Sequence, residues 1–374
     1  MSKNARPLRR GWTTGACATA AAKAACAALL SGAFPDPVEI TLPRGERVSF
    51  ALAVSRREGD VAMAGVVKDA GDDPDVTHGA LVQARVRAGA PGSGVTFRAG
   101  EGVGTVTRAG LPLAVGEPAI NPVPRQMIAQ AIGEVAAAAE RAADFAVEIA
   151  VADGAALAER TLNPRLGIIG GLSILGTTGI VIPYSCAAWI AGIRQGIDVA
   201  RALSLTHVAG ATGRASEDAV MRLHALPEQA LIDMGDFVGG MLKHLRTHPI
   251  ARVTIAGGVA KMTKLAQGLL DLHSQRGAVD LVALATLAEQ AGASPALLAR
   301  IRAANTAAEA FAHAQADGVA LGDVVARAAQ ATALAVVEGR DIAIETVLFD
   351  RDGAMVGRAA FRSAHAAPPR KRRR

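Results

Sequence analysis

The sequence contains few aromatic residues, few cysteines and no long apolar run. Phe, Trp and Tyr make up 3% of its 374 residues while 51% are hydrophobic, so small aliphatic side chains must fill the interior of a globular protein. No apolar run reaches the roughly 18 residues that a membrane span needs. The strongest candidate, residues 166–189, is interrupted by five glycines and a proline, and the apolar region after Gly15 contains Lys23 and lacks the aliphatic density of a signal peptide. We therefore expect a cytoplasmic protein with no membrane partner.

The cysteines exclude further kinds of site. Cys17, Cys26 and Cys186 form no CxxC pair and show no metal-ligand spacing, and an odd, small number without a secretory signal indicates reduced thiols. No cysteine has a partnered histidine, and the GxSxG of a serine hydrolase is missing. We predict no disulfide framework, no metal site and no nucleophile triad.

The positive charge is concentrated at one end of the chain. The formal net charge is +6, but Arg370 to Arg374 supply five of the 40 basic residues, which leaves 35 basic against 34 acidic residues elsewhere. Residues 363–374 are predicted to be a disordered basic tail. Because the rest of the chain is nearly neutral, we expect no nucleic-acid partner.

Residues 1–154 are predicted to form an α+β domain. Thr13 or Thr14 can cap an Ala-rich helix that Gly32 ends. Alternating apolar residues predict strands at 38–42, 48–56 and 61–68, the first two in a hairpin, and the strand-rich pattern continues at 80–88, 94–98 and 146–151. Residues 126–143 are predicted to be a helix.

Residues 155–362 are predicted to form a Rossmann-like α/β domain with a mostly parallel sheet. Short apolar strands alternate there with longer helical patterns, as in a parallel sheet with both faces covered. Residues 279–338 are almost wholly helical in pattern, and 342–349 with 355–361 predict a closing hairpin.

Glycines follow three predicted strands of this domain, at Ile169-Gly170-Gly171, at 209–214 and at Ala256-Gly257-Gly258. Ligands bind at the carboxyl ends of parallel strands, where glycine lets the backbone approach them. Neither GxGxxG nor GxxxxGK[ST] is present, which suits a cofactor without phosphate, such as S-adenosylmethionine. Ordinary tight turns explain any single loop better; for all three together the two interpretations are about equal. Asp233, Asp236 and Glu217 are candidate ligands of ribose hydroxyls that the sequence does not separate.

An acidic loop and a proline-rich loop in the first half offer polar groups. Asp69, Asp72, Asp73 and Asp75 lie within seven residues, flanked by Lys68 and His78, and such crowded carboxylates are expected to raise one another's pKa. A solvated turn is the alternative that composition alone favours. The segment GEPAINPVPR presents Glu117, Asn121 and Arg125 on a stiff loop, for which a structural crossover is an equal alternative.

Six stretches resemble the CbiD family, the cobalt-precorrin-5B C(1)-methyltransferases. They are GWTTGACATAAAKAA from Gly11, KDAGDDPDVTHG from Lys68, GEPAINPVPR from Gly116, NPRLGIIGGLSILGTTGIV from Asn163, GDFVGG from Gly235 and GGVAKMTKLAQGLLDLHS from Gly257. The long glycine-threonine segment and the acidic loop are the most specific. The resemblance implies two domains, the second Rossmann-like, and transfer of a methyl group from S-adenosylmethionine to C(1) of a corrin-precursor macrocycle, giving cobalt-precorrin-6A.

The predicted site follows from these stretches. The first domain is expected to face the macrocycle and the second to bind the cofactor; a homodimer is permitted. The expected catalytic residues are Asp72, Asp73 and Asp75. The expected substrate-binding residues are Lys68, Glu117, Asn121, Arg125 and Arg165. The expected cofactor-binding residues are Gly170, Gly171, Thr177, Thr178, Gly210, Thr212, Gly213 and Asp233.

Two other functions are compatible with the sequence. An NAD(P)-dependent reductase could use the same scaffold, although the missing GxGxxG argues against it. A non-catalytic tetrapyrrole-binding protein would bind the macrocycle without a saturable cofactor site.

Overall fold

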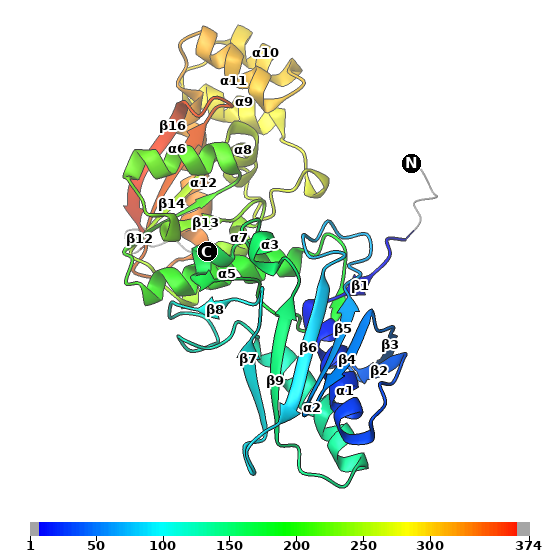
Figure 1. Ribbon diagram of the computed structural model, residues 1–374. Coiled ribbons are helices and arrows are strands. Elements are labelled where there is room, and N and C mark those ends of the chain that lie inside the picture. The colour runs from blue at the N-terminus through cyan, green and yellow to red at the C-terminus, as the bar shows by residue number, and fades with distance from the viewer. Residues whose placement is uncertain (1–6, 365–374) are drawn as a thin grey trace, which may run out of the picture. The chain divides into compact units, whose positions relative to one another are not determined.

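The computed structural model describes residues 7–364 and divides the chain into two compact units, Met1–Cys186 and Ala187–Arg374 (Figure 1). We call them the N-terminal and the C-terminal unit. The boundary lies later than the predicted one at residue 154, because the segment that follows pairs with the first half of the chain. Strand β10 (Ile168–Ile169) pairs with β8 (Thr105–Val106), and β11 (Ile180–Val181) pairs with β1 (Gly11–Trp12). Most of the predicted basic tail, from residue 365 on, lies outside the described residues.

The N-terminal unit is a five-stranded sheet covered by two helices, an α+β arrangement as predicted. The strand order is β4-β5-β6-β9-β7, with β7 and β9 parallel and the other pairs antiparallel. The strands are β4 (Val54–Glu58), β5 (Val61–Val67), β6 (Leu81–Ala88), β7 (Val95–Ala99) and β9 (Phe145–Val151), and a separate hairpin joins β2 (Val38–Thr41) to β3 (Arg47–Phe50). Every second residue of β9 is buried, which directs its apolar side chains to the helices.

Helix α1 (Thr14–Ser31) forms the centre of this unit and packs against β5, β6 and α2 (Pro122–Ala138). Its ends are those the sequence predicts: the Thr13 hydroxyl accepts a hydrogen bond from the Ala16 amide at 3.1 Å, and Gly32 adopts φ 83° after the last turn. Within the described residues it is the one helix long and apolar enough to cross a membrane by length and composition, and 72% of that stretch is buried inside the protein. Its alanines let the helix lie close to the sheet and to α2.

The C-terminal unit contains a five-stranded sheet in the order β13-β12-β14-β15-β16. Its strands are β12 (His207–Ala211), β13 (Leu231–Asp233), β14 (Arg252–Gly258), β15 (Ala343–Phe349) and β16 (Met355–Ser363). The first four in this order run parallel and β16 is antiparallel, so the sheet is mostly parallel, as predicted.

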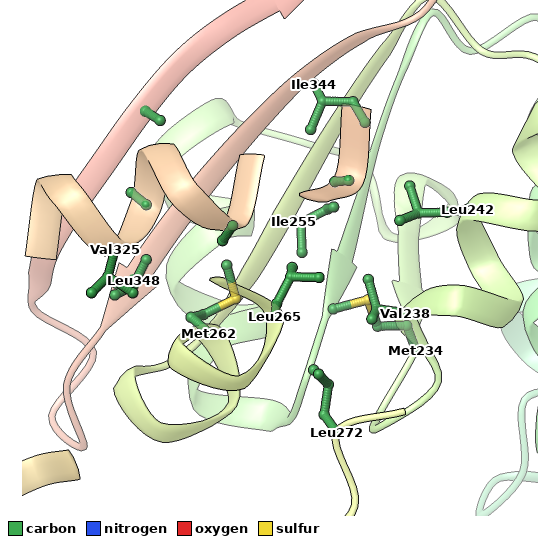
Figure 2. Close-up of a cluster of buried hydrophobic side chains, with 14 of the residues drawn as sticks. Met234, Val238, Leu242, Ile255, Met262, Leu265, Leu272, Val325, Ile344 and Leu348 are labelled. Atoms are coloured by element: carbon green, nitrogen blue, oxygen red, sulfur yellow. The ribbon is translucent and has the colours of Figure 1, made fainter. Parts of the chain in front are cut away.

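Helices cover both faces of this sheet. On one face lies α6 (Arg214–His224), over a small cluster that includes Ala209 and Val347. On the other face lies the large core, where Ile255 and Ile344 from the sheet meet Leu265 (Figure 2). The described helices around that core are α5 (Cys186–Ala202), α7 (Val238–Thr247), α8 (Val259–Ala266), α9 (Leu281–Gln290), α10 (Pro295–Ala303), α11 (Ala307–Ala316) and α12 (Leu321–Val336). The predicted helical stretch 279–338 is therefore four helices, three of which begin with side-chain caps from Asp280, Ser294 and Thr306.

Candidate functional site

The acidic loop follows β5 and is held from inside by a buried ion pair. The Lys68 side chain is 1% exposed, and its Nζ lies 2.6 Å from Asp75 Oδ2. The other oxygen of Asp75 accepts hydrogen bonds from the Thr77 amide at 2.8 Å and the Thr77 hydroxyl at 2.6 Å. Asp75 and Lys68 are thus ion-pair partners, a contact that gives them a structural role; the predicted roles of Asp75 in catalysis and of Lys68 in substrate binding stay predictions.

The pKa values of Asp69 and Asp75 move opposite to the prediction. Burial alone would raise the pKa of Asp75, but the charge of Lys68 and the hydrogen bonds from Lys68 and Thr77 outweigh it and lower that pKa. Hydrogen bonds from Arg9 and from the Gly71 amide lower the pKa of Asp69. The expectation that these carboxylates raise one another's pKa is wrong for both residues, because each has a cation or amide donors beside it.

The outer part of the loop is tied to two distant segments. Asp72 Oδ2 accepts a hydrogen bond from the Arg9 amide at 2.6 Å, and Asp73 Oδ1 accepts one from the Tyr184 amide at 2.7 Å. Gly71 has φ 68°, and a Cβ there would stand 2.1 Å from the Arg9 carbonyl oxygen, so only glycine allows this approach. Asp72 and Asp73 each keep one oxygen for which no partner is described.

The proline-rich loop is stabilised by the arginine predicted to bind substrate. Arg125 lies 2.8 Å from Glu117 Oε2, donates to the carbonyls of Ile120 (2.7 Å) and Pro118 (3.1 Å), and stacks 5.4 Å from the centre of the Phe97 ring. These contacts hold Arg125 and Glu117 in structural roles. Asn121 precedes α2 without capping it by its side chain, so its amide group stays a candidate contact.

The glycine-threonine segment lies in the N-terminal unit, apart from the parallel sheet. Gly171 closes against Gly102, where a Cβ would stand 2.2 Å from the carbonyl oxygen, and Thr178 Oγ1 bonds to Ile180 of its own loop. Gly170 and Thr177 are exposed. The prediction that Gly170, Gly171, Thr177 and Thr178 belong to the domain with the parallel sheet is therefore wrong: β10 and β11 pair with strands far back in the sequence. Arg165 is half-buried near the end of α4 (Asn163–Leu166), and its carbonyl oxygen accepts a hydrogen bond from the Arg108 guanidinium group at 3.1 Å.

The other predicted cofactor residues do meet at the carboxyl ends of parallel strands. Gly210 lies in β12, Thr212 and Gly213 directly follow it, and Asp233 ends the neighbouring strand β13, opposite Ala211. Gly210 faces the core, where a Cβ would stand 2.3 Å from Met241 Sδ, so this glycine serves packing. Helices α6 and α8 begin at these strand ends, after Gly213 and Gly258, with no side-chain cap. Their first amides are thus available to a ligand.

Two charged residues join this edge that the predicted site left out. Lys261, in the first turn of α8, donates from Nζ to the Thr212 carbonyl at 2.8 Å and lies 3.1 Å from Asp236 Oδ1. Asp236 is a candidate ribose acid from the sequence. Lys261 is not among the predicted site residues, although a lysine in the first helical turn after a glycine-ended strand is a usable signal. We call Thr212, Asp236 and Lys261 the strand-end cluster.

An exposed indole stands beside the cluster. Trp189 Nε1 donates to the Asp233 carbonyl at 3.0 Å, and its ring packs on Gly235, where a Cβ would be 3.2 Å away. The residue remains 48% exposed. One of the two tryptophans of the chain therefore lies at the strand ends with much of its side chain exposed.

A mostly parallel sheet with charged side chains and uncapped helix N-termini at its strand ends is the arrangement of an α/β protein, a class in which small molecules commonly bind at that edge. The CbiD family model matches residues 1–183, and the model of the CbiD C-terminal domain matches residues 271–360. The chain belongs to the CbiD family.

Named relatives cover nearly the whole chain. It is 61% identical over 369 residues to the cobalt-precorrin-5B C(1)-methyltransferase of Agrobacterium fabrum, covering 99% of this chain and 97% of the relative. It is 62% identical over 354 residues to that of Halorhodospira halophila, covering 95% of both. A crystal structure of a cobalamin biosynthesis protein (CbiD) from Archaeoglobus fulgidus matches 83% of this chain and 85% of its own, with 25% identity and a TM-score of 0.38.

Proposed function

We propose that this chain methylates C(1) of cobalt-precorrin-5B with S-adenosylmethionine, giving cobalt-precorrin-6A in the synthesis of the cobalamin ring, in the cytoplasm. The observation that carries this proposal is the 61% identity over 99% of the chain to a cobalt-precorrin-5B C(1)-methyltransferase.

We place the cofactor site at the carboxyl edge of β12, β13 and β14, in what we propose is a Rossmann-like unit. The donor set there fits an adenosylated amino acid: Asp233 at the end of β13 can accept ribose hydroxyls, Gly213 allows close approach of the ligand, and Thr212 offers its hydroxyl group. When bound, S-adenosylmethionine supplies a methyl group on a positively charged sulfur. The protein therefore has to align it with a carbon nucleophile and exclude water, and needs no group that activates the donor.

We assign the macrocycle to the N-terminal unit. Asp72 and Asp73 place carboxylates on the outer part of the acidic loop, where they can balance positive charge that moves from the sulfur to the macrocycle. Asn121 and Arg165 are the candidate contacts that we retain for the carboxylate side chains of the substrate; Lys68, Glu117 and Arg125 form ion pairs within the protein.

The test is a labelled-methyl assay. Purified protein is incubated with cobalt-precorrin-5B and S-adenosylmethionine deuterated in its methyl group, and the macrocycle is analysed by mass spectrometry. We expect a gain of one labelled methyl group, located at C(1) by NMR. A macrocycle that binds without gaining mass would indicate a tetrapyrrole-binding protein, and saturable binding of NADPH in calorimetry, with none of S-adenosylhomocysteine, would indicate a reductase. Either result overturns the proposal.

A further inference from the structure

The turn after β13 holds Asp236 in a fixed place. The Gly235 amide donates to the Ala211 carbonyl at 3.2 Å, which ties the turn to the end of β12. On the other side the Asp236 carbonyl accepts from the Leu272 amide at 2.8 Å. Gly235, with φ 53°, lets the indole of Trp189 lie against the turn. The backbone of Asp236 is therefore anchored on both sides.

The carboxylate of Asp236, unlike its backbone, has an oxygen atom that accepts no hydrogen bond from the described residues. Within the described residues its Oδ1 is buried and accepts no hydrogen bond; the ammonium nitrogen of Lys261 lies 3.1 Å away and donates to the Thr212 carbonyl. The side chain as a whole is 21% exposed, so its accessible surface lies on its other atoms. The lysine side chain is 37% exposed. An ammonium group has three donors, of which Thr212 takes one.

The edge thus presents one negative and one positive group side by side, both partly open to solvent. The uncapped start of α8 adds amide donors next to Lys261, in a helix end that favours anions. A single positive or negative ligand would meet repulsion from one of the two groups. A ligand that carries both charges on neighbouring atoms matches the pair.

We infer that Asp236 and Lys261 bind the amino-acid end of S-adenosylmethionine: Asp236 accepts from its α-ammonium group and Lys261 binds its α-carboxylate. Both ligand groups are carried by one carbon atom, so their spacing suits two protein charges whose atoms are 3.1 Å apart. The inference rests on the proposed function. Asp233 then binds the ribose, and Asp236 binds the amino-acid end. The inference also accounts for the partial exposure of the Asp236 and Lys261 side chains.

The experiment compares two ligands that differ in this end alone. S-adenosylhomocysteine keeps the amino-acid end, while 5′-methylthioadenosine lacks it and retains the adenosine part. Calorimetry measures both with the full chain and with Asp236→Asn and Lys261→Met. We expect each substitution to weaken S-adenosylhomocysteine on the order of 10- to 100-fold, as for the loss of a charge-assisted hydrogen bond, and to leave 5′-methylthioadenosine unchanged. Lys261→Arg, which keeps the charge, should restore most of the affinity.

Matched controls come from exposed charges of the same unit: Lys243→Met and Asp341→Asn should bind both ligands as the unchanged chain does. Fluorescence of Trp189, with Trp12→Phe to remove the second indole, gives an independent binding signal. If the unchanged chain binds S-adenosylhomocysteine and the two variants bind it equally well, or lose both ligands to the same extent, the inference is overturned while the proposed function stands. If the unchanged chain binds neither ligand, the cofactor site and with it the proposed function fail.

Discussion

Lys68 Nζ lies 2.6 Å from Asp75 Oδ2 inside the N-terminal unit, with the lysine side chain buried. This contact joins the end of β5 to the far side of the acidic loop. It sets the shape of the loop, and it leaves Asp72 and Asp73 as the carboxylates on its outer part. The ion pair therefore belongs to the buried half of the loop, and the carboxylates for which we propose a role in the reaction lie on the other half.

Asp75→Asn should destabilise the N-terminal unit. The change leaves a buried ammonium group without its counter-charge, a loss of about 3–5 kcal/mol in typical buried pairs. The double variant Lys68→Met with Asp75→Asn removes both charges and should be less affected than the single one. Urea unfolding followed by circular dichroism measures both. Equal stability of the Asp75→Asn variant and the unchanged chain would show that the pair contributes nothing.

The same pair predicts a loss of stability in acid. The folded-state pKa of Asp75 is lowered, so its contribution is present above the unfolded-state pKa of about 3.9 and is lost as the pH falls through the lower folded-state value. In the double variant this component disappears. Unfolding free energies measured at several pH values below 5 should thus fall less steeply for the double variant. Parallel curves would contradict the assignment.

Removing the outer charges of the acidic loop should affect the reaction and spare the cofactor. Asp72→Asn with Asp73→Asn keeps a carbonyl oxygen at each position, so the bonds from the amides of Arg9 and Tyr184 can persist. We expect turnover to drop by at least about tenfold, as for loss of a charge near the reacting atoms, with S-adenosylhomocysteine affinity unchanged. Asp72→Ala with Asp73→Ala, which also removes the acceptors, serves as the structural comparison. Full turnover in the asparagine variant would make the loop a structural turn.

Local patterns predicted the parallel sheet and the limits of α1, because both depend on short-range chemistry. Apolar strands alternate with helices in the second half, and Thr13 and Gly32 provide the cap and the stop at α1. The placement of residues 163–181 was not predictable in this way. Its glycine-ended strands look like strand ends of a parallel sheet, yet they pair with β1 and β8, and such long-range pairing leaves no local pattern.

Side-chain roles were harder to predict than elements, since burial depends on what packs above a residue. Lys68 stands beside four aspartates in sequence, which suggests a surface charge, but the fold buries it. Lys261 lies within an ordinary helical pattern, and only the convergence of β12, β13 and β14 brings it to Thr212 and Asp236. The composition of a segment does not show which distant residues pack against it.

The three thiols should differ sharply in reactivity. Burial raises the pKa of Cys17 to about 12 and that of Cys26 to about 11, whereas Cys186 is exposed. Because the thiolate is the reactive form, a disulfide reagent at pH 8 should label Cys186 rapidly and the other two only after denaturation. Peptide mass mapping identifies the labelled residue, and Cys186→Ser should abolish the fast phase. Fast labelling of Cys17 would mean that α1 opens readily.

His207 should contribute a second, separate pH dependence. It is buried at the start of β12, and burial first, then the charges of His224 and Arg252, lower its pKa to about 4 despite the opposing effect of Glu345. The unfolded chain gains this proton near pH 6.5, and the folded chain gains it only near pH 4. Between these two values only the unfolded state is protonated, so acidification favours unfolding. The loss across this window should be on the order of 3 kcal/mol.

His207→Gln should remove that component while keeping a group able to bond to the Thr254 hydroxyl, which lies 2.9 Å from His207 Nε2. Urea unfolding of both proteins at pH 7 and pH 5 isolates the effect, because the Asp75 contribution changes only at lower pH. NMR titration of the imidazole provides a direct check: it should remain neutral at pH 5. A protonated imidazole at that pH, or the same loss of stability in both proteins, would show that the ring is better solvated than its place between His224 and Phe361 implies.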